Sequence, residues 1–219
     1  MVGFFSLLTF FLDYYGRPLY NNRMFRNRRQ YIVLDIETGG LDPKKHSVLE
    51  VSGILWEPGK VIKPVFDCYI KEEEITTVPR AMEINQIDLS MVSKHGKTPK
   101  EAIKYIRSRL DDVLGIERRP VKILAHNASF DYSFLQRLYE LADKTIQKDF
   151  YGRTIDSASI LEFLMIVDHI KGNRASADVL FESTNNQIKD EERHRSYHDA
   201  LATAKSMETL FNIYLNGGK

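Results

Sequence analysis

Apolar residues run almost without interruption through YIVLDI at residues 31–36, a pattern typical of a strand that is covered on both faces. Two more strands are predicted at 47–57 and 61–70, and the PGK between them indicates a hairpin. The glycine-rich stretch that follows the first strand predicts a loop. Another short apolar run, VKILAH at 121–126, predicts a further strand.

Apolar residues at helical spacing predict helices in much of the remaining chain. The clearest helix spans residues 98–115. Its start carries the capping-box pair Thr98 and Glu101, with Pro99 at the first helical position. Further helices are predicted at 127–144, 155–168, 174–184 and 198–215. Early strands, followed by helices that alternate with a parallel-type strand, predict an α/β domain with a mixed central sheet flanked by helices.

Length, charge and cysteine content indicate the number of domains, the kind of partner and the cellular compartment. A length of 219 residues fits one domain of ordinary size. With 31 Lys and Arg against 30 Asp and Glu, the net charge gives no argument for a polyanionic partner, so any surface for nucleic acid must be local. The single cysteine, Cys68, excludes an intramolecular disulfide and a cysteine-based zinc site. It suits a reducing compartment, and we expect a cytoplasmic setting.

Residues 1–29 form an apolar and then basic extension before a domain predicted at 30–216. The apolar run at 2–12 is too short to span a bilayer, and it lacks the basic region and cleavage site of a secretory signal. Three interpretations remain open. The run packs on the domain or on a partner protein, it lies at a membrane interface beside the basic stretch at 23–30, or it precedes a true start at Met24. We expect contact with protein rather than with membrane.

Two acidic residues, Asp35 and Glu37, close the first predicted strand. Because side chains alternate along a strand, both carboxylates point to the same side while Ile36 points to the other. Two anions beside an apolar core are costly unless protons or cations compensate them, and carboxylate oxygens suit Mg²⁺ or Mn²⁺. The alternative is a pair of solvated residues at a strand end, which this motif alone leaves open.

A third acid, Asp131, follows the strand at 121–126 by about one helical turn. It therefore lies near the edge of the sheet where sites form in α/β proteins. An aspartate in a first helical turn also compensates the helix dipole. However, His126, Asn127 and Phe130 make a polar and aromatic cluster around it that a simple cap does not need.

A fourth acid, Asp199, starts the last predicted helix, and His194 stands five residues before it. Capping would explain Asp199 on its own, and a histidine in a basic loop can be merely exposed. Arg193 and Arg195 next to the histidine, together with Arg174, are candidates for contacts with phosphates.

The ordered set of a D-x-E pair on a strand, an aspartate on a helix and H-x4-D at a helix start resembles the DEDDh branch of the DnaQ-like 3′–5′ exonucleases. That family includes the proofreading subunit of bacterial replicative polymerases. The resemblance covers residues 30–214, and its motifs are VLDIETGGLDP, AHNASFDYSFL and HRSYHDALATA. It implies the ribonuclease H-like exonuclease fold and a hydrolase that removes nucleoside 5′-monophosphates from a 3′ end.

The resemblance also implies a cofactor, namely two divalent metal ions, Mg²⁺ or Mn²⁺. By this resemblance Asp35 bridges both ions. Glu37 and Asp199 hold the ion on the side of the nucleophile, while Asp131 holds or orients the second ion, largely through water.

His194 is then the expected general base, because an imidazole titrates near the operating pH. His198 is its rival. The motif spacing favours His194, since His198 is adjacent to Asp199 on the helix and would be directed about 100° away from it.

Substrate contacts are expected from Thr38, Gly39 and Leu41 after the first motif and from Asn127 and Phe130 in the second. An exonuclease holds a frayed 3′ end by stacking and backbone contacts, so sequence preference should be weak. Single-stranded DNA with a free 3′ end is the expected substrate. RNA with the same chemistry is the alternative, because the motifs do not reveal 2′-hydroxyl contacts. A non-catalytic nucleic-acid-binding module is a third interpretation.

The chain departs from the family pattern at two positions. Gly39 stands where relatives often have a second threonine, and Gln86 stands where a glycine is usual in the segment AMEINQID. Neither change removes an expected metal ligand, but both put local substrate contacts in question.

Overall fold

The structure is a computed structural model that describes residues 29–215. The apolar run at 2–12 and most of the basic stretch at 23–30 lie outside the described residues. The three interpretations of the extension therefore stay predictions.

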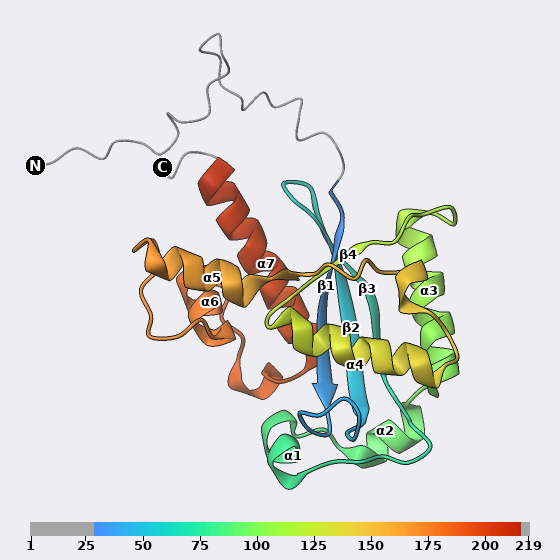
Figure 1. The fold of residues 1–219 in the computed structure, drawn as a ribbon. Helices are drawn as coiled ribbons and strands as arrows, with labels where there is room; N and C mark the ends of the chain where they lie inside the picture. Colours follow the sequence, from blue (N-terminus) through green and yellow to red (C-terminus); the bar gives the residue numbers. More distant parts are fainter. Residues whose placement is uncertain (1–28, 216–219) are drawn as a thin grey trace, which may run out of the picture.

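One five-stranded sheet forms the centre of the domain, in the order β3-β2-β1-β4-β5 (Figure 1). β1 pairs antiparallel with β2 and parallel with β4, which confirms the predicted mixed sheet. β5 adds a second parallel strand beside β4. The strands are β1 (Tyr31–Thr38), β2 (Val48–Glu57), β3 (Val61–Tyr69), β4 (Lys122–Ala125) and β5 (Ile155–Asp156).

Helices cover both faces of this sheet (Figure 1). They are α1 (Pro79–Asn85), α2 (Leu89–His95), α3 (Pro99–Leu114), α4 (Ala128–Leu141), α5 (Ser157–Ile166), α6 (Ala177–Ser183) and α7 (Ser196–Leu215). Successive side chains of β1 point to opposite faces of the sheet, so they belong to two separate apolar clusters. Ile32 and Leu34 pack with residues of α3 and α4, whereas Tyr31 and Val33 pack with residues of α5, α6 and α7.

The three early strands and the helix at 98–115 agree with the prediction to within two residues at each end. The predicted capping box is present, because Thr98 accepts from the backbone N–H of Glu101 while the Glu101 carboxylate accepts from the Thr98 N–H.

Other predicted elements need correction. The helix predicted at 155–168 is divided into β5 and α5, because Asp156 pairs in the sheet and its side chain then caps α5 through the N–H of Ala158 at 3.1 Å. The helix predicted at 174–184 is shorter, since Ser176 caps it at its start. Helices α1 and α2 were not predicted, because seven residues make only about two turns and show little periodicity.

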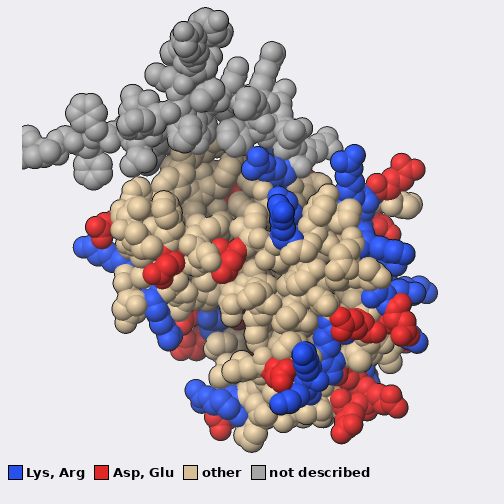
Figure 2. All heavy atoms as spheres, viewed as in Figure 1, with Lys and Arg blue, Asp and Glu red and all other residues tan. Residues whose placement is uncertain are grey.

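Basic and acidic side chains lie next to one another on the face shown in Figure 2, in keeping with the balanced composition. Within residues 29–215, no helix combines the length and apolarity that crossing a bilayer requires.

Candidate active site

The end of β1 supplies the first two carboxylates. Asp35 and Glu37 are half-buried while Ile36 between them is buried, so the two acids share one face of the sheet as predicted. That face is the one covered by α7. Glu37 lies opposite Glu50 of β2, and the pairing of the two strands shifts by one residue immediately afterwards.

Asp131 joins this pair from the first turn of α4. Its carboxylate is buried, at 3% exposure, and its Oδ1 accepts a hydrogen bond of 3.1 Å from the backbone N–H of Ile36. Because Ile36 separates Asp35 from Glu37, this bond fixes the start of α4 directly against the acidic end of β1.

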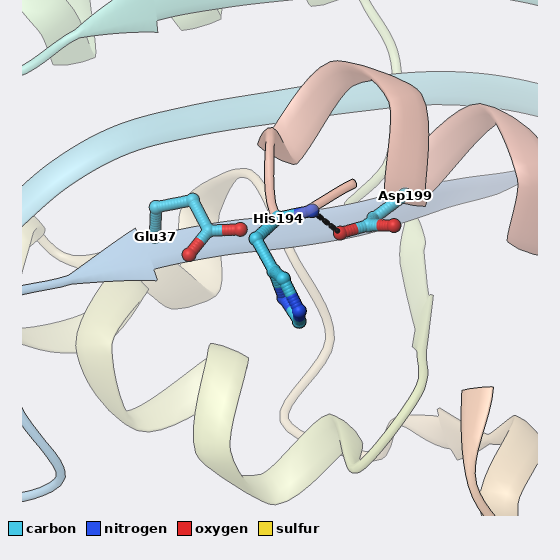
Figure 3. A group of neighbouring side chains, drawn as sticks. All are labelled: Glu37, His194 and Asp199. Carbon is cyan, nitrogen blue, oxygen red and sulfur yellow. Dashed lines mark hydrogen bonds between the residues drawn. The ribbon is translucent and has the colours of Figure 1, made fainter. Parts of the chain in front are cut away.

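His194 and Asp199 come from the loop before α7 and from its first turn. His194 has a left-handed backbone with φ of 57°, and its N–H donates to Asp199 Oδ2 at 3.0 Å (Figure 3). Ligand atoms of Glu37, His194 and Asp199 all lie within 4.8 Å of one another. The structure thus brings residues from the first and third motifs to a single place.

The electrostatics of this place favour a bound cation. Burial raises the pKa of Asp35 well above its usual range, and repulsion from Asp199, Glu37 and Asp131 adds to the effect. Burial likewise raises the pKa of Glu37, Asp131 and Asp199. Four carboxylates that destabilise one another's charged forms are suited to hard divalent cations, which bind oxygen ligands.

Arg193, predicted from the sequence only as a candidate for phosphate contact, lies at the carboxylates themselves. Its guanidinium bonds to Asp199 Oδ1 and, at 2.7 Å, to Asp178 Oδ1 of α6. It also lies over the ring of Phe181 at 5.2 Å. The positive charge lowers the pKa of Asp199 and thus partly offsets the effect of burial.

Glu50 is a residue that the motif analysis missed. It is buried on β2, and its carboxylate accepts from Arg195 Nη2 at 2.8 Å and from the N–H of Ser196 at 3.0 Å. These bonds tie the start of α7 to the sheet and so position His194. Arg195, a candidate for phosphate contacts, is therefore already paired. In the sequence, Glu50 was marked only as an acidic residue inside the mainly apolar strand predicted at 47–57.

His198 lies outside the close group. Its Nδ1 is 3.8 Å from Glu192 Oε2, and its ring packs edge-on against Tyr197 at 5.3 Å.

The comparison with known proteins agrees with this geometry. The sequence matches the family model RNase_T, described as Exonuclease, over residues 32–207. The chain belongs to this exonuclease family. The match confirms the resemblance to the DnaQ-like exonucleases and spans all three motifs.

Individual relatives are moderately similar, and the chain spans less than two thirds of the length of the first two relatives described here. The chain is 29% identical over 119 residues to the 3′–5′ DNA exonuclease Cap18 of Escherichia coli, covering 54% of this chain and 61% of Cap18. It is 29% identical over 175 residues to the PolC-type DNA polymerase III of Thermotoga petrophila, covering 80% of this chain but 11% of the polymerase. Ribonuclease T of Yersinia pseudotuberculosis is 24% identical over 190 residues, with 83% and 84% of the two chains covered.

Solved structures establish the fold. Escherichia coli Exonuclease I in complex with a dT13 oligonucleotide superposes with a TM-score of 0.68 at 17% identity, covering 84% of this chain and 41% of that one. Cell-death related nuclease 4 gives a TM-score of 0.68 at 15% identity, covering 85% and 64%. The predicted ribonuclease H-like exonuclease fold is confirmed.

The predicted substrate residues of the first motif differ in how exposed they are. Thr38 is buried, and its hydroxyl donates to Gly40 O at 2.7 Å. Both backbone groups of Gly39 are paired, with Ser47 O at 2.8 Å and with the N–H of Val78 at 2.7 Å. Leu41, in contrast, is 82% exposed next to them.

The side chains of the second motif differ in exposure and in their bonds within the domain. Asn127 is exposed at the start of α4 with φ of 69°, and its N–H donates to Asp156 at 2.8 Å. Phe130 is half-buried against Phe134, with ring centroids 4.9 Å apart. His126 is held by Ser157 and by a backbone carbonyl, and burial lowers its pKa. It therefore serves the scaffold.

The structure explains why a glycine is usual at the position of Gln86. Gln86 ends α1 in the left-handed conformation, with φ of 50°, which a glycine adopts at less cost. Its neighbour Asn85 is buried and donates to Thr38 O at 3.0 Å, so α1 is fastened to the end of β1.

Proposed function

We propose that the protein is a metal-dependent 3′–5′ exonuclease that hydrolyses the terminal phosphodiester bond of DNA and releases nucleoside 5′-monophosphates. The observation that carries the proposal is the approach of Glu37, His194 and Asp199 to within 4.8 Å, beside Asp35 and Asp131. Membership of the exonuclease family supports the reaction class.

The four carboxylates are the proposed holders of two Mg²⁺ or Mn²⁺ ions. Asp35 is proposed as the ligand shared by both ions, which is supported by its repulsion with Asp199, Glu37 and Asp131 and by the family resemblance. Asp131 is held by the Ile36 N–H and approaches from α4, which supports its separate role at the second ion. When bound, the ions supply positive charge at the phosphate and lower the pKa of the attacking water.

His194 is the proposed general base. It takes a proton from the attacking water while the water oxygen forms a bond to phosphorus. The bond from phosphorus to the 3′ oxygen of the preceding nucleotide breaks, and that oxygen takes up a proton from solvent. The products are a nucleoside 5′-monophosphate and a strand that is one nucleotide shorter.

We favour single-stranded DNA with a free 3′ end as the substrate. Cap18 is named as a DNA exonuclease, and Exonuclease I binds a DNA oligonucleotide in its solved complex. The exposed Leu41 next to the acidic end of β1 is suited to packing against an unpaired terminal base. Asn127 and Phe130 stay candidates for contacts on the other side of the site.

RNA is the second candidate substrate. Ribonuclease T is matched along 83% of this chain and 84% of its own length, which is fuller mutual coverage than the match to Cap18 gives. A cytoplasmic setting is part of the proposal, supported by the single cysteine, Cys68, which has no partner for an intramolecular disulfide.

A degradation assay tests the proposal. Matched 5′-labelled DNA and RNA oligonucleotides are incubated with the protein in Mg²⁺ or Mn²⁺. We expect the labelled DNA strand to shorten stepwise, the released product to comigrate with nucleoside 5′-monophosphates, and excess EDTA to stop the reaction. Faster shortening of RNA would instead assign the exoribonuclease function.

Two variants control this assay. Asp35→Asn removes a proposed ligand and should abolish shortening, whereas Asp143→Asn, on the surface beside Lys100, should leave it unchanged. Binding without shortening of either nucleic acid by the wild type would support the non-catalytic module. Shortening that begins at the 5′ end would contradict the proposed polarity.

A further inference from the structure

Helix α5 is rich in large apolar side chains, with Ser157, Ser159 and Glu162 as its polar ones, yet only part of its apolar surface is covered. Leu161 and Leu164 are buried against the sheet, whereas Phe163 is 60% and Ile166 is 71% exposed. Large apolar side chains that are exposed close together are typical of a surface that another segment or partner covers. The outer side of α5 therefore lacks a covering partner among residues 29–215.

A groove lies beside this uncovered surface. It has a volume of about 560 Å³ and runs between α5 and the second half of α7. Tyr31 and Trp56 of the sheet, Phe163 of α5, and Phe211 and Tyr214 of α7 are among its lining residues. Tyr214 and Leu215 are also well exposed at its end. The groove is an aromatic and aliphatic surface of the kind that accepts apolar side chains.

The chain enters the domain at this groove. Arg29, the first described residue, is itself a lining residue, and the side chain of the following Gln30 donates to Glu57 at the rim. The preceding apolar run at 2–12 is separated from Arg29 by a connection of 16 residues, 13–28, which can reach up to about 50 Å. A tether of this length gives an effective concentration on the order of millimolar.

The run itself has the matching chemistry. VGFFSLLTFFL carries no charge and contains four Phe and three Leu within 11 residues. Removing such side chains from water is favourable in proportion to the apolar area that is buried. We infer that residues 2–12 pack into the groove between α5 and α7 of the same chain, over Phe163 and Tyr214.

This docking site lies away from the proposed catalytic residues. Tyr31 at the groove and Asp35 and Glu37 at the site are separated by four to six residues of β1, or about 13–20 Å. Tyr214 and Asp199 likewise lie near opposite ends of α7. Docking should therefore stabilise the domain without covering the carboxylates, and its test does not depend on the proposed function.

Photocrosslinking tests the contact. The full-length chain carries p-benzoylphenylalanine in place of Phe163, or in place of Met91 of α2 as a control with an exposed apolar side chain at the other end of the sheet (Figure 1). Equal amounts of ¹⁴N and ¹⁵N protein are mixed before irradiation. We expect residue 163, but not residue 91, to crosslink to peptides from residues 2–12 of the same isotope. Mixed-isotope crosslinks would assign the groove to a second copy and overturn the inference, as would the absence of crosslinks to this segment.

A thermodynamic cycle provides a second readout. Phe163→Ser is made in the full-length chain and in a chain that lacks residues 2–12. We expect it to lower Tm by about 2–5 °C in the full-length chain and by less than about 1 °C in the shortened one, because the exposed ring then has no partner. Met91→Ser should have the same effect in both chains. Equal effects of Phe163→Ser in both chains would overturn the inference.

Discussion

The backbone of His194 distinguishes it from the nearby His198. Its left-handed conformation lets its N–H bond to Asp199 while its imidazole stays within 4.8 Å of Glu37 and Asp199. We expect His194→Ala to lower kcat about 10²- to 10⁴-fold, the usual contribution of a general base, with little change in Mn²⁺ affinity. Single-turnover degradation and calorimetric titration with Mn²⁺ measure the two quantities.

His198→Ala serves as the matched control for this prediction. Because its side chain faces Glu192 and Tyr197, we expect a change in kcat of less than about threefold. The assignment fails if His198→Ala alone reduces kcat while Mn²⁺ still binds.

Arg193 bonds to an oxygen of Asp199, one of the proposed metal ligands. Its guanidinium occupies Asp199 Oδ1 and is held there by Asp178. We expect Arg193→Gln, in protein without nucleic acid, to bind Mn²⁺ about 3- to 10-fold more tightly, because the positive charge no longer opposes the ion. Calorimetric titration at constant ionic strength measures the affinity.

The exposed Arg174 provides the same change of charge as a control. Arg174→Gln should change the affinity for Mn²⁺ by less than twofold. If Arg193→Gln weakens binding instead, then Arg193 positions Asp199 for the ion and does not compete with it.

At the scale of elements, the loop after β1 explains the departure from the family pattern. A Cβ on Gly39 would lie 2.3 Å from the carbonyl oxygen of Thr76, so the segment at 76–78 packs directly on this glycine. We expect Gly39→Ala to destabilise the fold by about 1–3 kcal/mol and to lower Tm by about 3–10 °C. Scanning calorimetry in EDTA measures the change without any contribution from metal binding.

Gly152 is the control position for this prediction, because a methyl group added there would not clash with the backbone. A Cβ on Gly152 would meet only Tyr132 Oη, at 3.6 Å, which is an ordinary contact. Gly152→Ala should therefore change Tm by less than about 2 °C. Equal destabilisation by both substitutions would show that crowding against Thr76 is not the cause.

The elements with long, regular patterns could be predicted from the sequence. The strand at 31–36 and the helix at 98–115 are specified by local residues, namely a continuous apolar run and a capping box. The division at Asp156 could not be predicted in this way, since it depends on pairing of β5 with β4 and on bonds to the start of α4. Tertiary contacts decide such boundaries.

The candidate site likewise combines residues that could be predicted from local motifs with residues that depend on tertiary contacts. Motif spacing selected Asp35, Glu37, Asp131, His194 and Asp199. The structure brings ligand atoms of Glu37, His194 and Asp199 within 4.8 Å of one another, and the roles of all five residues stay predictions. Motif spacing did not reveal Glu50, which acts through bonds to Ser196 and Arg195 that are distant in sequence. Positioning residues are visible only when the fold brings β2 and α7 together.

At the scale of the whole molecule, the site joins both layers of the domain. Asp131 comes from α4 on one side of the sheet, Asp199 comes from α7 on the other, and Asp35 and Glu37 come from the central strand between them. Repulsion among these acids therefore opposes the packing of both helical layers on the sheet. A bound cation would reduce this repulsion and so favour the packing. The stability of the entire domain should consequently depend on metal and on pH together.

The direction of this dependence follows from the raised pKa values. The ordinary values are 3.8 for Asp35 and 4.5 for Glu37, and both are raised in the folded protein, mainly by burial. Above these ordinary values the folded state holds more protons than the unfolded state, so the free energy of unfolding falls as pH rises through the window. In EDTA we expect Tm to be lower at pH 8 than at pH 5.5, and Asp35→Asn to reduce this difference.

Metal should reverse the trend, because only ionised carboxylates bind it. At a Mn²⁺ concentration 100 times the dissociation constant, binding stabilises the folded state by about 2.7 kcal/mol, or about 5–10 °C in Tm for a domain of this size. We expect this gain at pH 8, a smaller gain at pH 5.5 and little gain in Asp35→Asn, whereas Asp143→Asn should behave as wild type. A gain that is independent of pH and equal in Asp35→Asn would place the metal elsewhere on the protein. Differential scanning calorimetry over the four combinations of pH and Mn²⁺ therefore tests the site without relying on catalysis.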